Sequence, residues 1–172
     1  MVFDRGSRQI IEEILLMDGM VPTDHAPMLN DHRTYSIDEL FGSVRDFKII
    51  GKKLHCRFYF ADLSEIDNDD EAKRLERAWI KVKQRHLKGV SVGYRVLKSE
   101  MIAPGTSRKI NGTIYTAGDL PLRVALRWKP REGSLTVIQA DDASHIRQSM
   151  EATRMNPKLL KHLQSQGLRS DA

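Results

Sequence analysis

Cysteine is nearly absent from this chain, which has a single one, Cys56, among its 172 residues. One cysteine excludes an intramolecular disulfide and fits a reducing compartment. It also excludes a metal site made of cysteines, and the six histidines show no H-x-x-x-H spacing of the kind that binds zinc. The sequence therefore predicts neither a bound metal nor a cofactor.

Long apolar runs are missing as well. No stretch approaches the roughly 20 apolar residues of a membrane-spanning helix. No basic segment followed by an apolar core and a small-residue cleavage site marks a secretory signal. We therefore expect no membrane partner, and a chain of this length is expected to bury roughly 70% of its unfolded surface.

Charge of one sign is only in modest excess, with 28 Lys and Arg against 23 Asp and Glu and a net charge of +5. A basic excess can indicate nucleic-acid binding, but here basic and acidic residues are interspersed. The most basic segment, 73–88, is one face of a predicted helix that also carries Glu71 and Glu76. Nucleic acid is therefore an unlikely partner, and an acidic partner protein explains the charge as well.

Two segments predict secondary structure clearly. Residues 43–61 predict a β-hairpin that turns near Gly51-Lys52, and in its second arm apolar side chains alternate with polar ones. Asn68 is typical of a helix N-cap, and Gly89 is typical of a helix C-terminus, so we expect a helix between them. The apolar stripe of this helix has three- and four-residue steps: Ala72, Leu75, Trp79 and Val82.

The other segments are predicted more coarsely. Residues 7–17 fit a helix or a strand, and 90–97 reads as a strand after the helix. A small hairpin is expected over Asn111-Gly112. Strands are expected over 120–128 and 133–139, and helices over 141–155 and 156–167. The sequence thus predicts a β-rich body, one central helix and a helical C-terminal tail.

The run Gly89-Val90-Ser91-Val92-Gly93 reads G-x-S-x-G, the nucleophile-elbow pattern of many hydrolases. An elbow serine follows a strand and precedes a helix, and its acid and histidine partners come later in the chain. Here the helix comes first, and the only later histidines are His145 and His162, so the elbow interpretation is excluded. A serine nucleophile still needs a base, and His32 lies far upstream in Asn30-Asp31-His32.

Three blocks, taken in order, carry a resemblance to a known family. The first is 26–32, of the form P-x-L-x-D-H, and the second is the 70–88 helix followed by Ser-Val-Gly-Tyr at 91–94. The third runs from Trp128 to Asp141 and includes Glu132. Together they resemble the caudoviral prohead proteases, serine endopeptidases that mature tailed-phage capsids and share a fold with the herpesvirus assembly proteases. Gln139 departs from the family, which usually has proline there.

The resemblance implies an α+β fold, namely an antiparallel β-barrel flanked by helices, with a helical C-terminal tail. Residues 1–147 would form the prohead serine protease domain and residues 148–172 the tail. Ser91 would be the nucleophile and His32 the general base, with His25 as a weaker rival for the base.

Glu132 is the candidate third catalytic member, because a carboxylate that orients the histidine ring completes the logic of a triad. Asp31, Asp141 and His55 remain alternatives for this role. His55 is an alternative because the herpesvirus relatives have a histidine as third member, but the alternation of its strand explains His55 without catalysis.

The resemblance also implies substrates and a location. The enzyme would cleave scaffold and capsid proteins, and itself, inside the immature procapsid in the host-cell cytoplasm, and it is expected to self-associate. One competing hypothesis is a non-catalytic capsid-assembly or scaffold-binding module of the same fold. Another is a small basic β-barrel that binds nucleic acid.

Overall fold

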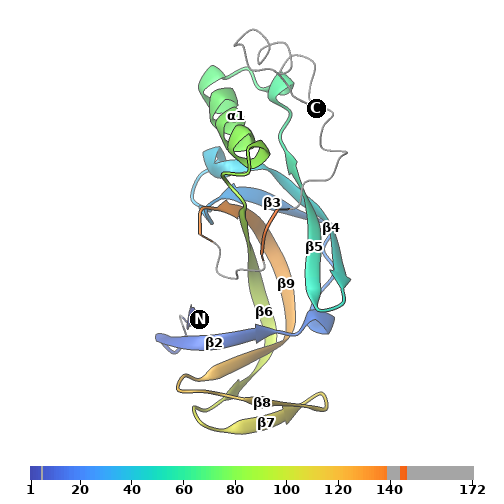
Figure 1. The fold of residues 1–172 in the computed structure, drawn as a ribbon, viewed down its shortest axis with the longest axis vertical. Coiled ribbons are helices and arrows are strands. Elements are labelled where there is room, and N and C mark those ends of the chain that lie inside the picture. Colours follow the sequence, from blue (N-terminus) through green and yellow to red (C-terminus); the bar gives the residue numbers. More distant parts are fainter. Residues whose placement is uncertain (5, 139–143, 147–172) are drawn as a thin grey trace. The chain divides into compact units, whose positions relative to one another are not determined.

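The computed structural model describes residues 1–4, 6–138 and 144–146. The described part contains one α-helix, and no helix there is long and apolar enough to cross a membrane. Figure 1 shows the elements in chain order. They are β1 (Val2–Asp4), β2 (Gln9–Leu15), β3 (His25–Asn30), β4 (Leu40–Ile50), β5 (Lys53–Phe60), α1 (Asp69–Lys83), β6 (Gly89–Ile102), β7 (Ser107–Ile110), β8 (Thr113–Thr116) and β9 (Leu122–Thr136). Three 3-10 turns lie between them, at Met17–Gly19, Ile37–Glu39 and Leu63–Glu65.

The chain divides into two compact units, and each is assembled from three separate segments. Unit 1 contains Met1–Ala26, Val44–Arg57 and Val92–Glu132. Unit 2 contains Pro27–Ser43, Phe58–Ser91 and the described residues from Gly133 onward. Five strands, β3, β4, β5, β6 and β9, therefore contribute residues to both units.

The strands form open sheets. The larger sheet has seven strands in the order β1-β2-β9-β3-β4-β5, with β6 also paired to β9, and β7 and β8 form a separate two-stranded sheet. Strands β1 and β5 end the order and do not pair with each other, so the described strands do not close. The prediction of an antiparallel β-barrel flanked by helices is therefore wrong. Polar–apolar alternation shows that a strand is half-buried, but it does not identify the neighbour at each edge.

Strand β9 organises the larger sheet through parallel pairing. In unit 1 it pairs with β2, from Glu12↔Leu122 to Leu15↔Ala125. In unit 2 it pairs with β3, from Met28↔Gly133 to Asn30↔Leu135. The sequence predicted two strands over 120–139, but β9 is continuous through Pro130, which lies between the two paired stretches. Parallel partners come from distant parts of the chain, and a local pattern does not indicate them.

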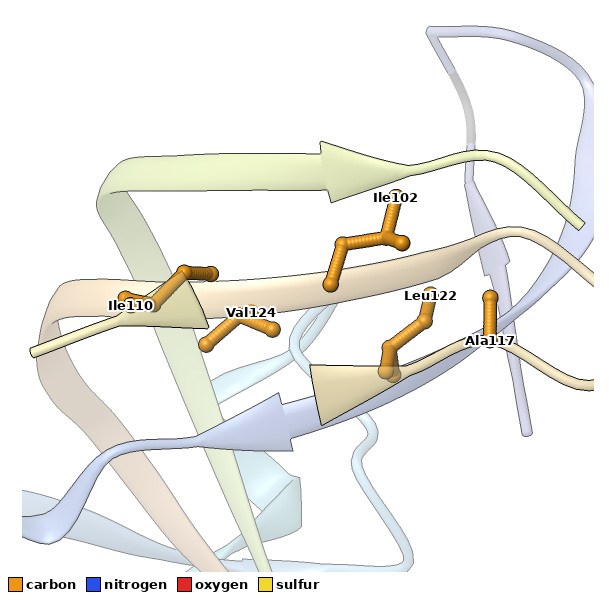
Figure 2. Close-up of a cluster of buried hydrophobic side chains, with 5 residues drawn as sticks. All are labelled: Ile102, Ile110, Ala117, Leu122 and Val124. Atoms are coloured by element: carbon orange, nitrogen blue, oxygen red, sulfur yellow. The ribbon is translucent and has the colours of Figure 1, made fainter. Parts of the chain in front are cut away.

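One hydrophobic cluster of unit 1 joins the β7–β8 hairpin to the strands that flank it. Figure 2 shows its five buried side chains: Ile102, Ile110, Ala117, Leu122 and Val124. The hairpin turn expected at Asn111-Gly112 is confirmed, since β7 pairs with β8 around it and both residues have positive φ, 47° and 84°. In the middle of β9, the fully buried Trp128 donates its ring N–H to the Leu16 carbonyl at 2.7 Å.

Helix α1 belongs to unit 2 and begins as the sequence predicts. The Asn68 side chain accepts hydrogen bonds from the amides of Asp70 and Glu71, which is the N-cap interaction. The helix ends at Lys83, earlier than expected, and Arg85 then takes a left-handed φ of 62°. Gly89 lies in β6 instead of terminating the helix.

The apolar stripe of α1 packs as predicted. Leu75 and Val82 are buried, and the Trp79 ring makes an edge-on contact with Phe60 of β5, with ring centroids 5.3 Å apart. This contact attaches the helix to the sheet of unit 2 and assigns the stripe to the core.

Two further expectations concern the ends of the chain. The segment 7–17, which fitted a helix or a strand, forms β2 and a 3-10 turn. The helix expected over 141–155 is wrong at 144–146, where His145 forms a β-bridge with Gly89. The rest of that helix, the helix over 156–167 and the tail domain 148–172 lie outside the described residues.

Candidate functional site

His32 lies in a tight turn immediately after β3. The Arg33 amide donates to the Asn30 carbonyl at 3.0 Å, and the two residues between them, Asp31 and His32, have positive φ values of 50° and 59°. Two positive φ values inside such a hydrogen bond define a type I′ turn, for which Asn-Gly is the preferred pair. A histidine at the second position is therefore strained, and strain of this kind is concentrated at functional sites.

Strand β9 holds this turn by accepting hydrogen bonds from two of its backbone amides. The Asp31 amide donates to the Leu135 carbonyl, and the His32 amide donates to the Ser134 hydroxyl, each at 3.0 Å. Ser134 is completely buried and pairs with Leu29 of β3. The backbone of His32 is thus fixed against β9, while its side chain is exposed.

Ser91 is the third residue of β6 and is half-buried. The prediction that it lies in a strand just after the central helix is confirmed. Ser91 and His32 both belong to unit 2, and their strands, β6 and β3, both pair with β9.

Glu132 belongs to unit 1, where its carboxylate lies against Gly93 of β6. A Cβ atom at position 93 would stand 2.1 Å from Glu132 Oε1 and 2.9 Å from its Cγ. The structure shows that the space beside Gly93 is occupied by the Glu132 side chain.

Strand β9 carries a row of buried polar side chains at alternate positions, Glu132, Ser134 and Thr136. Alternate residues of a strand point to one face, and three polar residues in succession are unusual where burial favours apolar ones. Among the described residues, the Thr136 hydroxyl is buried with no hydrogen-bond partner. The end of β9 that anchors the His32 turn is therefore polar on one face.

The alternatives for the third catalytic member lie in different places. Asp31 is exposed and precedes His32 in the turn. His55 is a half-buried residue of β5 in unit 1, and Asp141 lies outside the described residues. The rival base His25 is the exposed first residue of β3.

Sequence reasoning missed Glu39, which ends the 3-10 turn Ile37–Glu39 just before β4 and is buried. Its carboxylate accepts a hydrogen bond from the Asn30 side chain at 2.8 Å and pairs with Arg74 of α1 and, at 3.6 Å, with Arg33. The Asn30 hydrogen bond, together with the two guanidinium groups, lowers the pKa of Glu39 below its usual 4.5. No periodic pattern distinguishes this glutamate from the other acidic residues of its loop.

Unit 1 has a second polar cluster, in an open pocket next to β6. Arg123 donates to Glu13 and, at 2.7 Å, to Asp4, and the Tyr94 hydroxyl donates to Glu13. Burial, reinforced by the Glu13 carboxylate, raises the pKa of Tyr94. These groups satisfy one another, so the cluster joins β1, β2, β6 and β9 and presents no free reactive group.

Cys56 and the potential metal ligands give no reactive centre. Burial raises the pKa of the Cys56 thiol to about 11, so the thiol is protonated at neutral pH and is a weak nucleophile. In the ranges that the structure describes, no three His, Cys, Asp or Glu side chains gather in a way that could hold a metal ion.

Comparisons with protein-family models, with curated proteins and with solved structures find no match for this chain. The resemblance to the prohead proteases therefore depends on the three sequence blocks alone.

Proposed function

We propose that this protein is a serine endopeptidase in which Ser91 is the nucleophile and His32 is the general base. The observation that supports this most directly is the turn at His32. A histidine is held there in a strained conformation, its amide is fixed to β9, and its side chain is exposed. Glycine is the residue that this backbone conformation favours, so keeping a histidine there has a cost in stability.

The proposed reaction proceeds through an acyl-enzyme. His32 takes the proton of the Ser91 hydroxyl as the serine oxygen attacks the carbonyl carbon of the peptide bond. The same proton then goes to the leaving amine, and a water molecule, activated by His32, hydrolyses the ester and regenerates Ser91. Proton transfer by a positioned histidine contributes roughly 10²–10⁴-fold to such a reaction.

Glu132 is the proposed orienting group for the imidazole. It is a buried carboxylate whose side chain lies against Gly93 of β6. The role follows from the family resemblance: a carboxylate bonded to a catalytic histidine selects one tautomer of the ring and stabilises its cationic form. Asp31 and His55 are the alternatives that substitution at Glu132 tests.

The substrates in this proposal follow from the family resemblance. They are capsid and scaffold proteins, with self-cleavage, inside the immature procapsid in the host-cell cytoplasm. Self-association of the enzyme is part of the same proposal. A non-catalytic capsid-assembly module is the outcome if Ser91 proves unreactive.

The test compares the wild type with Ser91→Ala, with Ser99→Ala as the matched control, because Ser99 is an exposed serine of the same strand. Each variant is treated with a fluorophosphonate probe and analysed by intact mass, alone and after co-expression with its cognate capsid and scaffold proteins. We expect one labelled serine and discrete truncations in the wild type and in Ser99→Ala, and neither in Ser91→Ala. Equal labelling and identical masses in all three proteins would refute the endopeptidase proposal.

A further inference from the structure

We infer that Glu39 is the positioning residue for His32, because its carboxylate joins the two ends of the strained turn. This inference rests on the proposed function for its catalytic consequence, but the structural part can be tested without it. The turn comprises residues 30–33, and Glu39 contacts both the first and the last of them.

The contacts of Glu39 are divided between its two oxygens. Oε2 accepts from the Asn30 side-chain amide at 2.8 Å, while Oε1 faces the Arg33 guanidinium at 3.6 Å. Asp31 and His32 lie between these two residues and make their own hydrogen bonds to β9. The side chains at the ends of the turn are thus held on Glu39, and the backbone at its centre is held on β9.

Helix α1 fixes Glu39 itself through Arg74, which donates to Oε2. The Arg74 guanidinium also lies over the Phe41 ring, 5.4 Å from its centroid, so it is held from two sides. The 3-10 turn Ile37–Glu39, capped by Ser36, directs the glutamate inward. A buried carboxylate needs such partners, and here all of them come from unit 2.

The turn needs this support because its backbone is unfavourable for the residues in it. A non-glycine residue persists in the left-handed region only where its surroundings over-determine the conformation. Without the Glu39 contacts, we expect the turn to open more often and the imidazole of His32 to be displaced. A displacement of a catalytic group by about 1 Å can reduce a rate by roughly 10²-fold.

The test uses Glu39→Gln in the full chain, with Glu100→Gln as the control. The control removes an exposed ion pair, Glu100 with Arg108 at 3.0 Å, from unit 1. Amide hydrogen exchange is measured at Asp31 and His32, which donate to β9, and at the β7–β8 hairpin as a reference for global opening. We expect exchange at the two turn amides to accelerate about tenfold or more in Glu39→Gln. We expect no change at the hairpin and none in the control.

The same variants are then treated with the fluorophosphonate probe. We expect the maximal labelling rate of Ser91 to fall about 10- to 100-fold in Glu39→Gln. The probe concentration that gives half of this maximal rate should change little. Unchanged exchange at Asp31 and His32 would overturn the inference, whatever the labelling shows. Accelerated exchange in a protein whose wild type is never labelled would support the positioning role and refute the proposed protease.

A second variant keeps the test decisive if Glu39→Gln does not fold. Arg33→Gln alters an exposed arginine and removes only one of the two ends of the bridge. We expect it to accelerate exchange at the turn amides by a smaller factor. No acceleration in Arg33→Gln, together with an unfolded Glu39→Gln, would assign Glu39 to folding alone and overturn the inference.

Discussion

Replacing His32 with glycine should abolish activity and yet leave the protein more stable than His32→Ala. The left-handed backbone conformation costs a residue with a Cβ atom about 1–2 kcal/mol of free energy, and it costs glycine nothing comparable. Glycine loses about 0.5–1 kcal/mol more backbone entropy on folding. At a φ of 59° the net difference should favour glycine over alanine by about 1 kcal/mol. Both variants lack the imidazole, so its own contacts cancel in the comparison.

The measurement is thermal and urea unfolding of both variants in a Ser91→Ala background, where self-cleavage cannot interfere. For a chain of this size, about 1 kcal/mol corresponds to a melting temperature about 2–4 °C higher for His32→Gly than for His32→Ala. Activity is measured in the wild-type background, and both variants should be inactive.

His25 provides the control for this comparison. It is an exposed histidine in the extended backbone of β3, where glycine should be less stable than alanine by about 0.5–1 kcal/mol. The sign of the glycine–alanine difference should therefore reverse between positions 25 and 32. The same sign at both positions would show that His32 is not left-handed in solution and would refute the strained-turn argument.

Three further predictions concern side chains in the two units. Gly93→Ala places a Cβ atom 2.1 Å from Glu132 Oε1 and should displace that carboxylate. We expect the labelling rate of Ser91 to fall about tenfold or more. Circular dichroism should show that the variant is folded. Wild-type labelling in Gly93→Ala would argue against Glu132 as the orienting group. Trp128→Phe removes the hydrogen bond to Leu16 and part of a fully buried ring, and should cost about 1–3 kcal/mol in urea unfolding. Because the folded state lowers the pKa of Glu39, the unfolded state binds the extra proton first as the pH falls. Stability should therefore decrease below about pH 4.5, and this decrease should be smaller in Glu39→Gln, as unfolding midpoints measured across the acid range would show.

The sequence predicted those parts of the fold that depend on local chemistry. The hairpin around Gly51, the capped start of α1 at Asn68 and the tight turn at Asn111-Gly112 are all confirmed. Each follows from a residue whose backbone or side chain acts within a few positions of itself. The closed barrel was wrong because closure depends on which strands meet at the edges, and β9 takes two parallel partners from the first 30 residues.

For the candidate site, the sequence showed the residue types but not the long-range contacts that hold them in place. Ser91 was correctly placed in a strand after the helix, while the contact between Gly93 and Glu132 joins residues 39 positions apart. Glu39 and Arg74 are 35 positions apart, and nothing in either segment indicates the other. Long-range contacts between charged side chains have no period, so only the three-dimensional structure identifies them.

The turn at His32 shows why a backbone conformation can be hidden from pattern reasoning. Asn-Gly between two strands predicts a type I′ turn, whereas Asp31-His32 does not. The structure nevertheless has that turn, held by Ser134 and Leu135 of β9 and by the contacts of Glu39. Keeping a histidine in this turn costs folding free energy that glycine would not cost. The glycine–alanine difference in stability, which should reverse its sign between positions 25 and 32, measures that cost without any assumption about the substrate.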